Sequence, residues 1–264
     1  MLPIERRALA DANLAEFARE HARWLPPTHI EECTDLLLAA AGTRAPGPWN
    51  AVMTLGPEPA DPERVLDAAR AFFDPLEHHA SIYIRAHLDL ELELACRRHG
   101  FELGSDSPGM LLAAPADPPV LTPGTSVRQA RSEAETQAFV EIAAGAYETL
   151  QIPAAVTRKL LTWPARWCTQ HVQAFLLYEQ QLAAAGAMLL WSHGIAGLYW
   201  VGCLPQMRRR GYAELLTRAL CEHAFTHGAR MVVLQASREG EPIYRRIGFE
   251  EFTRYRTYRR AYTF

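Results

Sequence analysis

The second half of the chain alternates between apolar runs that suit strands and amphipathic segments that suit helices. The apolar runs are short and rich in β-branched and aromatic residues, which is typical of strands in a sheet. The expected strands are 126–131, 171–179, 181–191, 195–204, 231–237 and 249–260. The expected helices are 133–147, one after Pro153, 212–227 and 241–248. This alternation predicts an α/β or α+β fold with helices on a mixed sheet.

The first half shows a shorter version of the same pattern. The expected elements are strands at 49–56 and 80–88 and helices at 61–73 and 90–101. The first of these helices opens with Asp61 followed by Pro62, a typical helix start. The spacing from Pro62 to the Gly–Phe pair at Gly100 nearly equals that from Gly211 to the Gly–Phe pair at Gly248. This predicts two related units, although α/β proteins alternate in this way without duplication.

A proline-rich segment separates the two halves. Residues 113–125 contain four prolines, and such a segment favours an extended conformation with little regular structure. We therefore expect a linker here, between a first domain at 1–112 and a second domain at 126–264.

Composition narrows the possible partners and the compartment. The chain of 264 residues is 49% hydrophobic and 22% charged, as in globular proteins with a sizeable core. Its net charge of −3 is unsuited to nucleic acid, so any basic site is local. The start of the chain lacks the apolar segment of a signal peptide, and the most apolar stretch, 182–191, is too short to span a membrane. The bias toward arginine and alanine suggests a GC-rich bacterial genome, and we expect a cytoplasmic protein.

Neither cysteines nor histidines predict a metal centre. The five cysteines are widely spaced and form no CxxC pair, which argues against a zinc site and against a disulfide framework. They are Cys33, Cys96, Cys168, Cys203 and Cys221. His78, His79 and His87 have no third ligand at a convincing spacing. We expect reduced thiols and no bound metal.

Three consecutive arginines precede the helix expected at 212–227. A helix N-terminus carries a partial positive charge, so Arg208, Arg209 and Arg210 destabilise it unless a negative partner compensates. The unsatisfied backbone amides there form a ready anion site, and Gly211 permits close approach of a ligand. The pattern predicts a phosphate-bearing ligand, in particular a pyrophosphate. A solvated arginine run without a ligand is the alternative.

Two motifs around this helix resemble those of a known family. Residues 208–213 fit the pattern Q/R-x-x-G-x-G/A after an apolar strand, and this resembles the acetyl-coenzyme A motif of the GNAT N-acyltransferase superfamily. The segment PIYRRIGF at 242–249, a tyrosine followed four residues later by Gly–Phe, resembles that superfamily's second motif. Their order and spacing are more specific than either motif alone, and the resemblance covers about residues 126–264. P-loop and dinucleotide fingerprints are both absent from the sequence.

The resemblance implies a mixed, mostly antiparallel sheet flanked by helices and a site for acetyl-CoA. The strand before the motif would pair with the pantetheine arm, and the following loop and helix amides would hold the pyrophosphate. The implied cofactor-binding residues are Val201, Gly202, Cys203, Arg208, Arg209, Arg210, Gly211, Tyr212 and Ala213. Tyr244 matches the tyrosine that commonly protonates the departing coenzyme A thiolate, a role as general acid.

The sequence departs from the family pattern at the general base. Many relatives place an acid on the splayed strand, but 195–203 contains none. His193, Tyr199 and Glu179 lie nearby in the sequence, and Ser237 stands where an asparagine often follows the next strand. None of them is assigned as the base. The segment 146–167, with Tyr147, Trp163 and Trp167, is where we expect the acceptor pocket.

The first half keeps the expected scaffold but lacks the motif residues. After the strand at 49–56 comes PEPADPERV, which has acidic residues and no arginine-led glycine motif. Cys96 stands at the position equivalent to Tyr244, and a small buried residue is the favoured interpretation. This resembles tandem GNAT proteins with a degenerate N-terminal unit.

The expected function is an N-acetyltransferase that transfers acetyl from acetyl-CoA to a primary amine by direct attack. We expect a small-molecule amine acceptor, no nucleic-acid or membrane partner, and a monomer or homodimer. Two alternatives stay open: a non-catalytic acyl-CoA sensor, and a protein-interaction module whose arginines are only surface charge.

Overall fold

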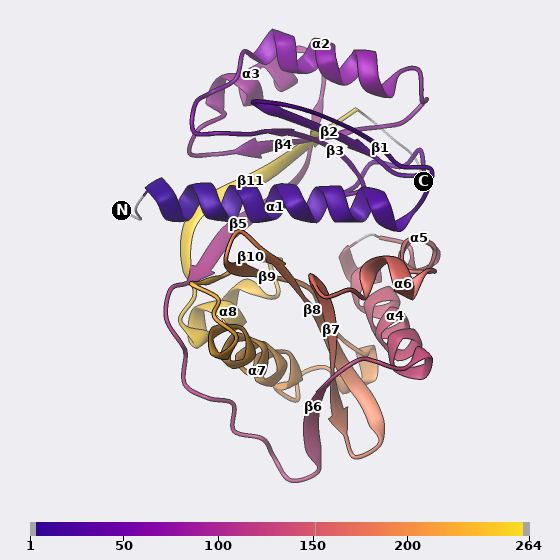
Figure 1. Ribbon diagram of the computed structural model, residues 1–264, viewed down its shortest axis with the longest axis vertical. Helices are drawn as coiled ribbons and strands as arrows, with labels where there is room; N and C mark the ends of the chain where they lie inside the picture. The colour runs from indigo at the N-terminus through magenta and orange to yellow at the C-terminus, as the bar shows by residue number, and fades with distance from the viewer. Residues whose placement is uncertain (1–3, 151, 261–264) are drawn as a thin grey trace. The chain divides into compact units, whose positions relative to one another are not determined.

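The computed structural model describes residues 4–150 and 152–260, which form two compact units. Unit 1 contains the described residues up to Met110 and those from Glu251 onward, and unit 2 spans Leu111–Glu250. In each unit, helices flank the strands of a sheet (Figure 1). This confirms the fold class expected from the sequence.

Unit 1 is a sheet with three helices. Its helices are α1 (Ile4–Trp24), α2 (Pro62–Phe73) and α3 (Leu90–Arg98). Its strands are β1 (His29–Cys33), β2 (Leu36–Ala40), β3 (Asn50–Thr54), β4 (Ser81–Arg85), β5 (Glu102–Leu112) and β11 (Glu250–Arg259). They lie in the order β1-β2-β3-β4-β11-β5. The β3–β4 pair is parallel, whereas β1–β2, β2–β3 and β4–β11 are antiparallel.

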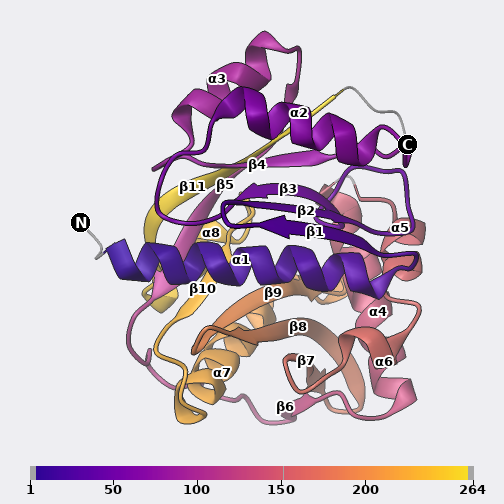
Figure 2. The same ribbon diagram turned by 45° about the horizontal axis from the view of Figure 1, so that its top comes forward.

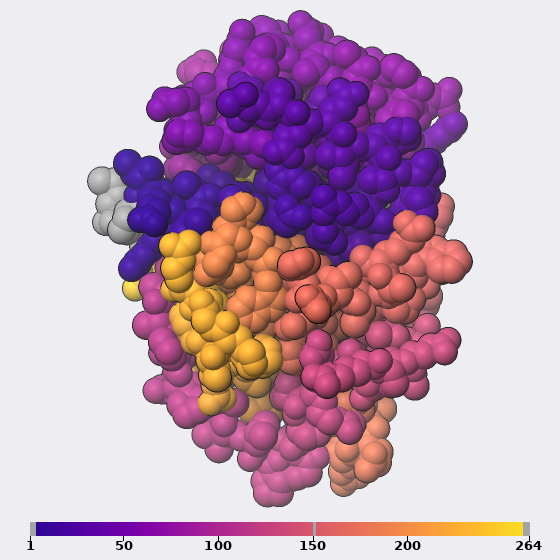
Figure 3. All heavy atoms as spheres, in the orientation of Figure 1, coloured from indigo at the N-terminus to yellow at the C-terminus, as the bar shows by residue number. Residues whose placement is uncertain are grey.

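The core of unit 1 is built on strands that are buried on both faces. Every residue of β2 and β3 is buried. Side chains of α2 and α3, including Leu66 and Phe73, pack in one cluster with Leu38, Val52 and Ile82 of the sheet. Helix α1 contacts β2 and β3 and lies on the other side of these strands (Figure 2). Its outer side is part of the surface of unit 1, where it is drawn in indigo (Figure 3).

Unit 2 has a five-strand arrangement with the order β10-β9-β8-β7-β6. Its strands are β6 (Thr125–Gln129), β7 (Val172–Glu179), β8 (Leu182–Ser192), β9 (Ile195–Cys203) and β10 (Val232–Gln235). Its α-helices are α4 (Glu133–Tyr147), α5 (Ala154–Leu160), α6 (Pro164–Trp167), α7 (Tyr212–Thr226) and α8 (Glu241–Ile247). Short 3-10 turns are η1 (Glu148–Leu150) and η2 (Pro205–Met207). Only the β9–β10 pair is parallel among the paired strands of this unit.

A pair of glycines brings α4 close to the strands of unit 2. Gly186 and Gly202 face each other across β8 and β9. A Cβ atom at Gly202 would lie 2.5 Å from Cβ of Ala146, and one at Gly186 would lie 2.9 Å from the Phe139 ring. Only glycine fits here, so the end of α4 lies directly on the end of β9. Helices α4 and α7 lie on opposite sides of these strands (Figure 1).

The two units divide the chain differently from the expected domains at its C-terminal end. Residues 113–124 contain no helix or strand, in keeping with a linker. Strand β11, however, belongs almost entirely to unit 1, because it pairs with β4 along Tyr255–Tyr258 and buries Tyr258 in the core of unit 1.

Among the described residues, no helix is long and apolar enough to cross a membrane.

Candidate active site

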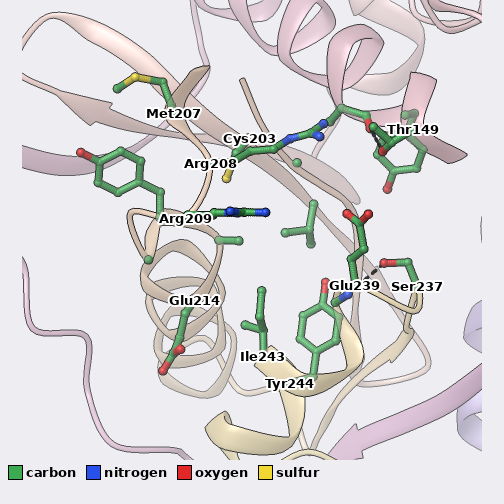
Figure 4. A pocket seen from close by; sticks show the side chains of 18 of the residues that line it. Thr149, Cys203, Met207, Arg208, Arg209, Glu214, Ser237, Glu239, Ile243 and Tyr244 are labelled. Atoms are coloured by element: carbon green, nitrogen blue, oxygen red, sulfur yellow. Dashed lines mark hydrogen bonds between the residues drawn. The ribbon is translucent and has the colours of Figure 1, made fainter. Parts of the chain in front are cut away.

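Unit 2 contains a cavity of about 710 Å³ that opens where four segments meet. The end of α4, the end of β9, the start of α7, and the loop from β10 into α8 all contribute side chains (Figure 4). A cavity of this size is typical of small-molecule and cofactor sites. Each of the four segments brings different chemical groups to its wall.

Strand β9 has a free edge toward this cavity because β10 diverges from it. The two strands pair only at Val232↔Ala196 and Val233↔Gly197, near the start of β9. On its other side, β9 stays paired with β8 as far as Cys203. The far end of β9 therefore presents backbone donors and acceptors that β10 does not take. Val201, Gly202 and Cys203 all line the cavity.

A bulge accompanies this divergence. The β8–β9 register shifts between Gly186 and Met188, which pair with Gly202 and Tyr199 respectively. Trp200, inside the shifted stretch, has φ of 54°, a left-handed conformation that is uncommon for a non-glycine residue. Such a bulge bends a strand and increases its twist. We infer that it turns the end of β9 away from β10.

The start of α7 offers backbone amides to the cavity. Gly211, at the N-cap, has φ of 80°, and no side chain caps the helix. Arg209 also has a left-handed φ, of 62°. Residues in this conformation near a turn direct successive N–H groups into one concavity, which favours anions. Gly211 and Ala213 line the cavity, and its wall here is therefore a concentrated set of donors.

The three arginines point to two different places. Arg208 and Arg209 line the cavity (Figure 4). Arg210 instead forms an ion pair with Glu179 at the end of β7, with 3.0 Å between Nη1 and Oε2. Glu179 also accepts a hydrogen bond from the Tyr212 hydroxyl. Of the nine expected cofactor residues, Arg210 alone is absent from the cavity lining. Its ion pair with Glu179 instead holds the start of α7 against β7.

Tyr244 of α8 points its hydroxyl into the cavity (Figure 4). Its ring is 8% exposed and lies against the loop before α8, where a Cβ on Gly240 would meet it at 2.8 Å. Burial, with smaller contributions from Cys221 and Cys203, raises the pKa of the Tyr244 phenol well above its ordinary value. The phenol is therefore protonated at neutral pH, as a general acid must be.

Comparisons with known proteins agree with this geometry. Residues 174–252 match the family described as "Acetyltransferase (GNAT) domain". This segment contains most of β7, all of β8 to β10, both motif helices and the arginine-led loop. Unit 2 carries a GNAT acetyltransferase domain. The resemblance stated from the two sequence motifs is thereby confirmed for residues 174–252.

Solved structures share the fold over nearly the whole chain. A GCN5-related N-acetyltransferase from Kribbella flavida is 19% identical, with a TM-score of 0.74 over 95% of this chain and 96% of that one. A second one, from Sphaerobacter thermophilus, is 18% identical with a TM-score of 0.65, covering 87% and 81%. A tandem GNAT protein from the clavulanic acid biosynthesis pathway is 13% identical with a TM-score of 0.60, covering 98% and 96%. No curated protein matches the chain.

Cys203 of the GNAT domain lines the cavity as a neutral thiol. Burial raises its pKa to about 11, although Arg208 and the backbone N–H of Ala213 act in the opposite direction. The nucleophilic form of cysteine is the thiolate. At neutral pH, Cys203 is therefore unsuited to carry an acyl group.

None of the three nearby base candidates lines the cavity. Glu179 is engaged by Arg210 and Tyr212, Tyr199 is buried in β9, and His193 lies exposed in the β8–β9 turn. Ser237 does line it, and so does Glu239, which no sequence motif singled out. A usable signal existed, since Glu239 closely follows the strand that diverges from β9 and such strand ends carry functional residues.

The expected acceptor segment 146–167 contributes only through its first residues. Ala146, Tyr147 and Thr149 line the cavity. Trp167 is instead fully buried against Phe139, with ring centroids 5.5 Å apart, and Trp163 is 56% exposed. Trp167 is thus part of the hydrophobic core, and Trp163 is part of the surface.

The equivalent position in unit 1 has a structural role. Cys96 of α3 is fully buried in the core cluster of that unit, and burial raises its pKa to about 12.

Within the described residues, no group of three or more histidine, cysteine or acidic side chains is placed to hold a metal ion.

Proposed function

We propose that unit 2 transfers the acetyl group of acetyl-CoA directly to a primary amine of a small-molecule acceptor. The observation that carries the proposal is the open first turn of α7. Its N-cap residue, Gly211, has no side chain to cap the amides, and Gly211, Arg208 and Arg209 line the same cavity. This donor set fits a pyrophosphate, because backbone amides and guanidinium groups both bind phosphate oxygens.

The diverging edge of β9 suits the pantetheine arm of the same ligand. Val201 and Cys203 on this edge line the same cavity as Gly211 of α7 and Tyr244. Amide groups of an extended arm can pair with such an edge as an additional strand would. Bound in this way, acetyl-CoA supplies an activated thioester carbonyl near Tyr244.

Direct attack is favoured over an acyl-enzyme route by the state of Cys203. Its thiol is protonated at neutral pH because burial raises its pKa to about 11. The acceptor amine therefore attacks the thioester carbon itself. Backbone N–H groups of β9 stabilise the developing oxyanion, and the Tyr244 phenol donates its proton to the departing sulfur. The nitrogen then loses a proton, which restores the phenol, so the bonds and protons balance.

The experiment is calorimetric titration of acetyl-CoA into the protein and two matched variants. Gly211→Glu places a carboxylate and a strained left-handed residue in the α7 turn, and we expect an affinity loss on the order of 100-fold. Gly56→Glu is the control, because Gly56 has a similar φ of 78° and is exposed in unit 1. A Cβ atom added at either glycine would have no neighbouring atom within 4 Å.

The control variant should bind as the unchanged protein does. Equal losses in both variants would assign the effect to backbone strain rather than to the site. If the unchanged protein does not bind acetyl-CoA, the proposed function is wrong. Binding without acetylation of any amine would instead support a sensor.

A further inference from the structure

Five charged residues line the cavity, and two of them, Glu214 and Arg246, pair with each other. Arg208 and Arg209 lie at the start of α7, at the end proposed for the pyrophosphate. Glu239 lies in the loop between β10 and α8, across the cavity from Glu214 (Figure 4). This arrangement favours a negatively charged ligand group beside the arginines and a positively charged group beside Glu239.

The loop that carries Glu239 is held firmly. The backbone N–H of Gly240 donates to the Ser237 hydroxyl at 3.1 Å and to the Ser237 carbonyl at 3.1 Å. The N–H of Glu241 donates to the same carbonyl at 2.9 Å. Because Gly240 packs against the Tyr244 ring, this turn places Glu239 at the same end of the cavity as the proposed acid. The carboxylate points into the cavity near Thr149 (Figure 4).

Glu239 differs from the other acid of the lining in being available. Glu214 is engaged by Arg218 at 3.1 Å and by Arg246 at 3.2 Å. No ion pair or hydrogen bond joins the Glu239 carboxylate to another residue in the described part of the chain. Glu239 therefore offers the cavity an uncompensated negative charge.

This charge suits a cation other than the reacting nitrogen. The attacking nitrogen must be unprotonated, and a carboxylate beside it would stabilise the unreactive ammonium form instead. A positive charge a few bonds away from the nucleophile has no such conflict. Ala146, Tyr147 and Ile243 also line the cavity, and Tyr147 is held by packing on Trp200 with ring centroids 4.5 Å apart. This wall suits a short hydrocarbon segment between the two nitrogens.

We propose that Glu239 determines specificity by binding a second positive charge on the acceptor. The acceptor class is then a diamine or another small molecule that carries a cationic group near its reacting primary amine. The inference rests on the proposed function of the same site and adds the substrate class to it. It also predicts that an acceptor with a carboxylate in that place is rejected, because the two negative charges repel each other.

The test uses a pair of probes that differ in one charge. 1,4-Diaminobutane and butylamine are titrated into the protein saturated with coenzyme A, and both are then offered to the acetyl-CoA complex as acceptors. We expect the diamine to bind about tenfold more tightly and to show the higher kcat/KM, as for a charge-assisted contact. Glu239→Gln should remove this preference without changing the affinity for acetyl-CoA.

Two further variants separate a specific contact from a general loss of charge. Glu222→Gln makes the same change at an exposed position of α7 outside the cavity lining, and it should retain the preference. Glu239→Lys should favour butylamine over the diamine. Equal binding of the two probes by the unchanged protein, or no detectable binding of either, overturns the inference. A failure of the proposed function is recognised separately, by the absence of acetyl-CoA binding.

Discussion

Helices α2 and α7 have the same place in their units but differ in what fills their first turn. Each follows one strand of a parallel pair and precedes the other, as β3–α2–β4 and β9–α7–β10. In α2, the Asp61 side chain accepts a hydrogen bond from the N–H of Glu63 at 3.1 Å, and Pro62 has no N–H to satisfy. In α7, Gly211 provides no cap and Arg208 and Arg209 stand nearby.

The difference shows that a chain can either occupy a helix N-terminus with its own side chain or leave it open to a ligand. In unit 1 a carboxylate of the protein already holds the amide that a phosphate would need. In unit 2 the N-cap residue has no side chain to do so, and the arginines before it add mobile positive charge. The same backbone geometry therefore serves stability in one unit and fits ligand binding in the other.

The two parallel strand pairs, β3–β4 and β9–β10, also differ in whether side chains of the protein fill the space at their ends. Strand β3 pairs with β4 as far as Met53, and the Thr54 hydroxyl that follows donates to Asp89 at 2.9 Å. Buried Arg85 binds the same carboxylate, so polar side chains close this end of the pair. Strand β9 leaves β10 after Gly197 and continues beside a cavity. Of these two parallel pairs in the described residues, only β9–β10 leaves a backbone edge open next to a helix whose N-cap residue makes no side-chain hydrogen bond.

The largest expected effect concerns α8 and α3, the helices that follow the two parallel strand pairs. Tyr244 of α8 and Cys96 of α3 occupy equivalent positions in them. We expect Tyr244→Phe to lower kcat by about 100-fold or more, because a general acid typically contributes at least this factor. Acetyl-CoA affinity should stay unchanged. Cys96→Ala in unit 1 is the matched control and should leave kcat as it is. Steady-state kinetics with the best acceptor found measure both.

The pH dependence of kcat sharpens this prediction. Burial raises the pKa of Tyr244 above its ordinary value, so the phenol keeps its proton through the neutral and mildly alkaline range. The acid function is lost only when pH rises through that raised pKa. We therefore expect no decline of kcat from this group below about pH 10. A decline near pH 8 that Tyr244→Phe abolishes would contradict the assignment.

An intermediate effect is expected within the arginine run. Arg208→Ala and Arg209→Ala should each weaken acetyl-CoA binding by about tenfold, as expected for loss of a charge-assisted phosphate contact. Arg210→Ala should have a smaller effect, because that guanidinium pairs with Glu179 outside the cavity lining. Titrations at two salt concentrations distinguish them, since losing a phosphate contact also reduces the salt dependence. Equal losses in all three variants would indicate a diffuse charge effect.

The smallest effect is expected in unit 1. Asp61→Ala removes the α2 cap and should lower the free energy of unfolding by about 1 kcal/mol. It should not create an acetyl-CoA site, because the arginines and the open strand edge are still missing. Urea denaturation and calorimetric titration measure the two quantities. Asp67→Ala, which breaks an exposed ion pair with Arg70 in the same helix, should have the lesser effect on stability.

Much of the architecture could be predicted from the sequence because unit 2 has long, strongly patterned elements. The helix expected at 133–147 coincides with α4, and the six strands expected in the second half all exist with shifted ends. Helix α1 was not predicted, since half of its buried residues are alanines, namely Ala10, Ala15, Ala18 and Ala22. Small residues give a weak periodic signal. The start of β5, with Gly104 and Pro108, reads as a loop.

The site shows which features local sequence carries. The glycine at the start of α7 and the tyrosine of α8 are local motifs, and both reach the cavity. The direction of the Arg210 side chain depends on Glu179, a partner far away in the sequence, so the motif alone could not reveal it. The position of Glu239 just after β10 is a local signal, but its place beside Tyr244 depends on how the loop folds back.

The return of the last strand to unit 1 has a consequence for biosynthesis. Strand β4 needs β11 as its neighbour, and residues 250–259 are translated only after all of unit 2. The unit that begins first on the ribosome is therefore completed last. Until then, β4 exposes an unpaired edge, the kind of surface that promotes aggregation. Nascent chains stalled before residue 250 should accordingly engage chaperones through unit 1, although unit 2 has already been synthesised.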